Sequence, residues 1–180
     1  LTAGSAWIAQ SLKLDADLEK QLPTGQPYIQ TVLDYKDKIA GLNSVQIVVE
    51  AREGGVWNAA FLKTLYDVTQ DVLFLPGISR ESVTSLWTPN TFVYQATESA
   101  VEGRTLISAT VLPEALSPRD VARIRADAFK GGYRGRLFAL DAKSAMIHAS
   151  IQPVMPDGTP TDFIAIAAEL ESKIRGKFEN

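Results

Sequence analysis

The chain of 180 residues contains no cysteine and only one histidine, His148. The first absence excludes disulfides, thiolate metal sites and cysteine nucleophiles together. With one histidine, a metal site would depend on carboxylate partners, and no spacing of acidic residues supports one. No P-loop, G-x-G-x-x-G fingerprint or G-x-S-x-G nucleophile elbow occurs either. The sequence therefore predicts no catalytic residue, no metal ligand and no cofactor, and we expect a protein that is not an enzyme.

Basic residues and long apolar runs are also scarce. The formal net charge is −3, so the chain has no basic field with which to bind nucleic acid. No run approaches the 18 or more apolar residues of a membrane span, and no leader-like segment opens the chain. Because it begins at Leu1 and has methionine only at positions 146 and 155, we expect a processed or excised piece of a longer protein.

The composition that remains is ordinary for a soluble globular protein, with 46% apolar and 22% charged residues. Residues 1–27 are mixed and contain Pro23 and Gly25, so they are interpreted as an extended lead-in. Residues 28–180 are expected to form one domain. Its first element is a predicted helix with a stripe of Tyr28, Val32, Tyr35 and Ile39.

A β-α-β unit is predicted next. Residues 44–51 are short and rich in β-branched side chains, which favours a strand. Asn58 is a suitable N-cap for the helix that follows. Pro76-Gly77 ends that helix, and a second strand is expected over 78–86. The apolar stripe of the helix consists of Phe61, Leu65, Val68 and Val72. The crossover between the two strands should be right-handed.

Residues 88–116 are irregular and are interpreted as an insertion with one short strand, since loops this long inside compact domains are usually functional or belong to extensions. Ser117, Pro118 and Asp120 then occupy the N-cap, N1 and N3 positions of a new helix. Gly131-Gly132 end it. The side chains that continue this helix are Val121, Ile124 and Ala128.

A hairpin and a final helix complete the pattern. Residues 136–140 and 144–151 flank a turn and are predicted to pair. Thr159, Pro160 and Asp162 repeat the N-cap, N1 and N3 signals, and the stripe that follows is Phe163, Ile166, Leu170 and Ile174. The order predicts an α+β fold made of split β-α-β halves on one antiparallel sheet. This is the ferredoxin-like arrangement, with an extension at about 88–116 between the halves and a last strand expected after Asn180.

Four aromatic side chains lie in or beside irregular segments, namely Trp57, Trp87, Phe92 and Tyr94. One interpretation is packing within the core and between subdomains. The other is an apolar surface that meets a hydrophobic ligand or another domain. They are the candidate contact residues of this sequence.

Several motifs, in this order, resemble the first large extracytoplasmic loop of an RND-superfamily exporter. They are LEKQLP, PYIQTVLDYKDK and FLPGISRESVTSLWTPN. The resemblance is closest to the "predicted exporters" similar to MmpL-type lipid and hydrophobe transporters. It spans nearly the whole chain and is weakest in residues 95–116 and after residue 152.

The resemblance implies a non-catalytic, porter-type domain at the periplasmic face of the bacterial inner membrane, with transmembrane helices on both flanks. The implied cargo is a hydrophobic or amphiphilic small molecule or a lipid. The implied partners are other porter subdomains and the transmembrane helices of the same parent chain, with further periplasmic or outer-membrane proteins. The parent is expected to be a homo-oligomer. The alternative from the residues is a free-standing ferredoxin-like ligand-binding or regulatory module, because a fold does not choose a function.

Overall fold

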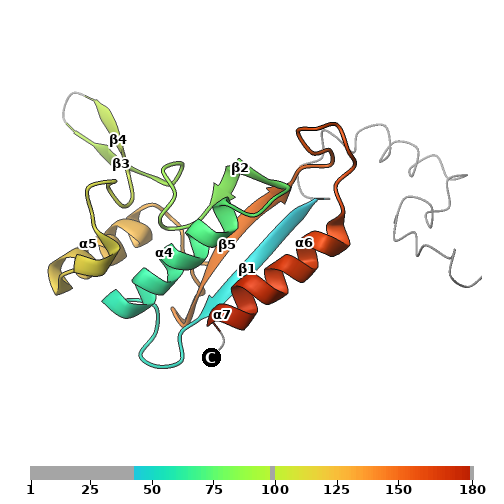
Figure 1. Cartoon of the computed structure of the whole chain (residues 1–180). Coiled ribbons are helices and arrows are strands. Elements are labelled where there is room, and N and C mark those ends of the chain that lie inside the picture. The colour runs from blue at the N-terminus through green and yellow to red at the C-terminus, as the bar shows by residue number, and fades with distance from the viewer. Residues whose placement is uncertain (1–42, 98–99, 179–180) are drawn as a thin grey trace, which may run out of the picture. The chain divides into compact units, whose positions relative to one another are not determined.

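A computed structural model describes residues 43–97 and 100–178, which form an α+β unit with two antiparallel sheets (Figure 1). The strands are β1 (Ser44–Glu50), β2 (Ile78–Thr84), β3 (Phe92–Ala96), β4 (Val101–Thr105) and β5 (Ser144–Ile151). The helices are α4 (Ala59–Leu73), α5 (Pro118–Lys130), α6 (Phe163–Leu170) and the short α7 (Gly176–Phe178). A 3-10 turn, η1 (Pro113–Ala115), precedes α5, and a π turn, η2 (Glu171–Arg175), joins α6 to α7.

The larger sheet has the order β1-β5-β2, and β5 is antiparallel to both neighbours. The register between β1 and β5 runs without interruption from Ser44↔Ser150 to Glu50↔Ser144. The pairing of β2 with β5 shifts between Ser79 and Thr84. Because both outer strands oppose β5, β1 and β2 point in the same direction, and α4 connects them. The predicted β-α-β unit is therefore present, with β5 inserted between its two strands.

One face of this sheet carries the core, and α4 and α6 lie together on that face (Figure 1). Along β5, Ala145, Ile147 and Ala149 are buried, whereas the alternate side chains are only half-buried. His148 belongs to the second set, as its position in the alternation predicts. Its Nε2 lies 3.0 Å from the carbonyl oxygen of Arg136.

The predicted start and stripe of α4 are confirmed. The side chain of Asn58 accepts a hydrogen bond of 2.8 Å from the backbone N–H of Phe61. All four predicted stripe residues of α4 are buried. Gly77 follows the helix with a φ of +80°, a conformation that favours glycine.

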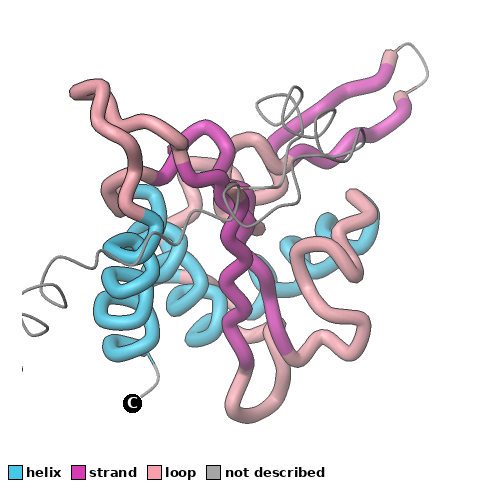
Figure 2. Tube along the Cα trace, turned by 90° about the vertical axis from the view of Figure 1, so that its right-hand side faces the viewer, coloured by secondary structure: helices cyan, strands magenta, loops and turns pink. Residues whose placement is uncertain are grey.

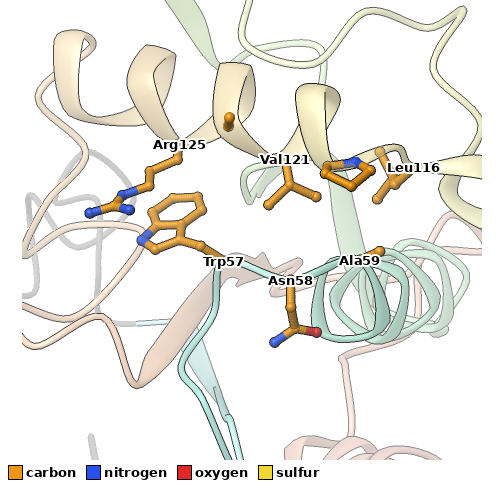
Figure 3. Close-up of a pocket in the computed structure, with 8 residues that line it drawn as sticks. Trp57, Asn58, Ala59, Leu116, Val121 and Arg125 are labelled. Carbon is orange, nitrogen blue, oxygen red and sulfur yellow. The ribbon is translucent and has the colours of Figure 1, made fainter.

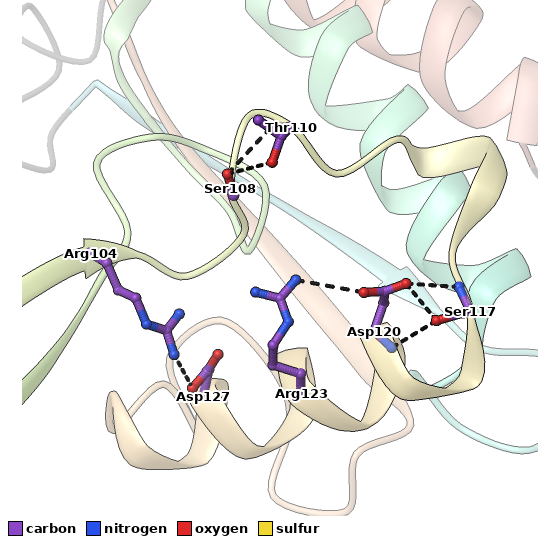
Figure 4. Close-up of polar contacts among 7 residues, drawn as sticks. All are labelled: Arg104, Ser108, Thr110, Ser117, Asp120, Arg123 and Asp127. Atoms are coloured by element: carbon purple, nitrogen blue, oxygen red, sulfur yellow. Dashed lines mark hydrogen bonds and ion pairs between the residues drawn. The ribbon is translucent and has the colours of Figure 1, made fainter.

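The predicted start of α5 is also confirmed, as a complete capping box (Figure 4). Ser117 Oγ accepts from the backbone N–H of Asp120, and the Asp120 carboxylate accepts from the N–H of Ser117. The helix ends at Lys130, immediately before Gly131. Ile124 and Ala128 are fully buried, which anchors α5 in the same core as α4.

The insertion differs from the prediction, because it contains two strands and not one. β3 and β4 form a hairpin in the register Phe92↔Thr105 to Ala96↔Val101. The sequence obscured β4 because Glu102, Gly103 and Arg104 interrupt any apolar alternation there. Figure 2 shows the hairpin projecting from the rest of the described unit. Its base is held by Leu106, whose N–H donates 2.8 Å to the carbonyl of Thr91.

Two predictions in the C-terminal half differ from the structure. Residues 136–140 form no strand, but they do pair with β5, through a bridge between Phe138 and Ala145 and two backbone hydrogen bonds of 2.9 Å. The pairing stops there because the chain turns back at Gly135, whose N–H donates to the carbonyl of Phe138. Thr159 is not an N-cap. Its N–H and hydroxyl both donate to Asp157, and the cap of α6 is Asp162, which accepts from Ile164 and Ala165.

The lead-in over residues 1–27 and the predicted helix from Tyr28 to Ile39 lie outside the described residues. Among the helices that are described, none combines the length and the apolarity needed to cross a bilayer.

Candidate functional site

A groove of about 430 Å³ lies between the start of α4 and one side of α5 (Figure 3). Its volume falls within the range of about 300–1,000 Å³ that is usual for small-molecule pockets. Residues that line it include Trp57, Asn58, Ala59, Leu116, Val121 and Arg125. Most of these side chains are apolar, so the groove favours an apolar or amphiphilic occupant.

Trp57 is the largest side chain at the groove. Its ring packs edge-on against Phe138 at a centroid distance of 4.9 Å and lies 6.2 Å from the ring of Phe129. Its indole Nε1 is buried and has no hydrogen-bond acceptor among the described residues. Buried donors are almost always paired in native structures, so this unpaired N–H is unusual.

The polar side chains at the groove differ in how far their hydrogen-bonding groups are already paired within the chain. Asn58 accepts from Phe61 and donates 2.8 Å to the carbonyl of Gly55, so both ends of its amide are in use. Arg125 is exposed, and its guanidinium lies 5.9 Å from the ring centre of Phe129. Within the described part of the chain it forms no ion pair and no hydrogen bond. The groove thus holds a cation with unused donors.

Trp87 lies elsewhere and fixes the exit from β2. Its indole Nε1 donates 2.8 Å to the carbonyl of Leu62 on α4, and its ring meets Tyr66 edge-on at 5.2 Å. A backbone carbonyl near the start of α4 accepts this bond, so the loop after β2 is tied directly to that helix. Trp87 therefore has an evident structural role.

The segment around Trp87 is a buried network of hydroxyl groups. Ser85 N–H donates 2.9 Å to Thr88 Oγ1, and both Thr88 and Thr91 donate to the carbonyl of Ser85. Thr69 on α4 donates 3.1 Å to Ser85 Oγ. These contacts turn the chain without a regular ladder, which explains why polar residues and Pro89 follow a strand that packs on the core.

Phe92 and Tyr94 lie on the exposed face of the β3–β4 hairpin. Their exposed fractions are 40% and 64%, and their rings are 6.4 Å apart. Tyr94 also lies over Gly103, where an added Cβ would come within 2.9 Å of the Tyr94 ring. The structure therefore separates the four candidate aromatics into a groove residue, a loop anchor and a pair on the hairpin.

Sequence patterns missed the residues that complete the groove around Trp57. Arg125 and Phe129 lie on α5 outside its buried stripe, and Phe138 lies in the segment interpreted as a strand. The only signal was the predicted helical position of Val121, which faces the groove. No local pattern indicates that this side of α5 meets the start of α4.

The two carboxyl groups with lowered pKa values, Asp120 and Asp157, do not line the groove. The pKa of Asp120 is lowered, first by hydrogen bonding to the Ser117 side chain and then to its backbone. The pKa of Asp157 is lowered in the same way by Thr159. Among the described residues, no three acidic or histidine side chains are grouped as a metal site would require.

Comparison of the chain with protein-family models, with curated proteins and with solved structures finds no match in any of the three.

Proposed function

We propose that this chain is a porter-type domain of an RND-superfamily exporter. It would handle hydrophobic or amphiphilic cargo at the periplasmic face of the bacterial inner membrane without a catalytic step. The observation that carries the proposal is the strand order β1-β5-β2, with α4 and α6 on one face of the sheet. That order is the one expected for three strands of a ferredoxin-like, split β-α-β sheet.

Two further features support this reading. In a ferredoxin-like sheet the helix after the middle strand leads to a last strand beside β1, and α6 follows β5 in the corresponding place. The irregular segment between the half-motifs forms a projecting hairpin with exposed aromatic residues, which suits contact with other subdomains of a parent chain. Of the sequence motifs that resemble the family's first loop, FLPGISRESVTSLWTPN covers β2 and the loop after it, and the other two lie outside the described residues.

The direct test is the reading frame on either side of this segment. The proposal expects an apolar run of about 20 residues on each flank, and a second related loop further along the frame. A start codon and a stop codon close to the two ends would overturn it. The chain would then be treated as a free-standing ligand-binding or regulatory module with the same fold.

The location can be tested separately by cysteine labelling, because this chain has no native cysteine. Ala126→Cys places a thiol on an exposed position of α5, and Ala128→Cys places one at a fully buried position. In cells with a permeable outer membrane, a membrane-impermeant maleimide should label the first parent variant and not the second. Labelling of Ala126→Cys only after lysis of the inner membrane would exclude a periplasmic location.

A further inference from the structure

We infer that the groove between Trp57 and α5 binds an anionic amphiphile, with the acidic head held by Arg125 and Trp57 and the apolar chain lying against Leu116 and Val121. The inference names a ligand class for the proposed function and depends on that function for its cellular role. The binding itself is a property of this chain and can be measured on it alone.

The charge of the ligand follows from the donors at one end of the groove. Figure 3 shows the indole nitrogen of Trp57 on the same side of the groove as the guanidinium of Arg125. The buried Trp57 nitrogen has no acceptor among the described residues, and the exposed Arg125 forms no hydrogen bond or ion pair with them. Two neighbouring donors, one of them cationic, match a carboxylate, which accepts several hydrogen bonds and carries the opposite charge.

The burial of Trp57 strengthens this choice. A buried donor without a partner is costly, so a ligand oxygen that pairs with it recovers a free energy that the free chain forgoes. Arg125 is exposed and its long side chain can move to admit such an oxygen. The stacking of Arg125 on Phe129 leaves its N–H groups available, because a cation–π contact uses the face of the ring and not an acceptor atom.

The apolar part of the ligand follows from the other end of the groove. Leu116 and Val121 are half-buried, and together with Ala59 they present hydrocarbon and no hydrogen-bonding group. The amide of Asn58 already bonds to Phe61 through its oxygen and to Gly55 through one of its two N–H groups. A chain of methylene groups is thus favoured there over a polar ligand.

The test uses the 180-residue chain with ¹⁵N-labelled tryptophan and decanoate, at concentrations below its micelle formation. The chain has three tryptophans, and Trp57→Phe identifies the indole signal of Trp57 by its loss. We expect that signal to shift saturably with decanoate. In Arg125→Gln the dissociation constant should rise about tenfold or more, the loss expected when a charged hydrogen bond is removed.

Arg119→Gln is the matched control, because Arg119 lies on the same helix but does not line the groove. It should bind decanoate as the unsubstituted chain does. Decyltrimethylammonium, which has the same chain length and a cationic head, should leave the Trp57 signal in place. The inference is overturned if decanoate does not move that signal, if the cationic amphiphile moves it equally, or if Arg125→Gln binds normally. Those results would leave the exporter proposal to the reading-frame test.

Discussion

Arg104 on β4 and Asp127 on α5 form an ion pair, with 2.6 Å between Nη2 and Oδ1 (Figure 4). The Asp127 side chain is only 10% exposed, whereas that of Arg104 is 48% exposed. This pair ties the projecting hairpin to α5. Tyr133 adds a second tie, since its hydroxyl donates 2.7 Å to the carbonyl of Phe92. The exposed aromatic face of the hairpin is thus presented from a fixed base.

Removing Arg104 should destabilise the protein, because it leaves the Asp127 carboxylate buried without its cation. We expect Arg104→Gln to lower the free energy of unfolding by about 1–3 kcal/mol. A cycle with Asp127→Asn and the double variant, measured by urea unfolding, should give a coupling of about 0.5–3 kcal/mol. Arg123→Gln is the control, since the Arg123–Asp120 pair is wider, at 3.8 Å, and more exposed. Equal losses in both arginine variants would contradict the assigned role of Arg104.

Replacing tryptophan by phenylalanine should lower the free energy of unfolding by different amounts at Trp87 and Trp57. Trp87→Phe removes the bond to the Leu62 carbonyl and should cost about 1–2 kcal/mol of unfolding free energy. Trp57→Phe removes an N–H that has no acceptor among the described residues, so its cost should be smaller. Thermal and urea unfolding of the two variants measures the difference. A larger loss for Trp57→Phe would show that its indole N–H has a partner in the folded chain.

The stability should fall in acid, partly through the two shifted carboxyl groups. The pKa values of Asp120 and Asp157 are lowered in the folded chain from 3.8, so both groups bind a proton more readily when unfolded. Their contribution is therefore complete above the unfolded pKa and is lost as the pH falls through the folded pKa. Urea unfolding from about pH 5 to about pH 3 should show this loss.

The capping partner of Asp120 provides the control for that pH dependence. Ser117→Ala removes the hydroxyl that is the largest cause of the lowered pKa of Asp120. The variant should be less stable near neutral pH, because a helix cap is lost, and its stability should depend less on pH in the acid range. An unchanged acid slope in Ser117→Ala would mean that the Ser117–Asp120 pair does not contribute to it.

Gly77 links the end of α4 to α6. It has a φ of +80°, and an added Cβ would lie 2.5 Å from Ile166 Cδ1. Gly77→Ala should therefore cost about 1–3 kcal/mol, from backbone strain and from the displaced isoleucine. Gly158→Ala is the matched control, because Gly158 has a φ of +83° and open space around its Cα. Similar losses in the two variants would mean that the contact with Ile166 adds nothing.

Local patterns in the sequence were sufficient for the elements whose determinants are close in the chain. The cap at Asn58, the capping box of Ser117 and Asp120, and the alternation along β5 were predicted and are present. Local patterns failed where a second local contact competes for the same side chain. Thr159 is a residue type that often caps helices, but its hydroxyl donates a hydrogen bond to Asp157. The helix begins later, after Asp162.

The candidate groove was predictable in one residue only. Trp57 stood out as an aromatic side chain in an irregular segment, but its neighbours Arg125 and Phe129 come from a helix far along the chain. Phe92 and Tyr94 also stood out, and the neighbouring sequence does not distinguish an aromatic residue on a hairpin from one that lines a groove. Which aromatics share a site depends on packing between elements, and periodicity along one element does not encode that.

The sequence by itself determined the order of β1, α4, β2, α5, β5 and α6, the burial of the apolar stripe of α4 and the absence of cysteine chemistry, because each depends on residue type and short-range spacing. The tertiary structure alone decided that β5 lies between β1 and β2, that Trp87 bonds to α4, and that Arg125 lies beside Trp57. These relationships join distant segments, and their free energy comes from contacts that exist only once the core has closed.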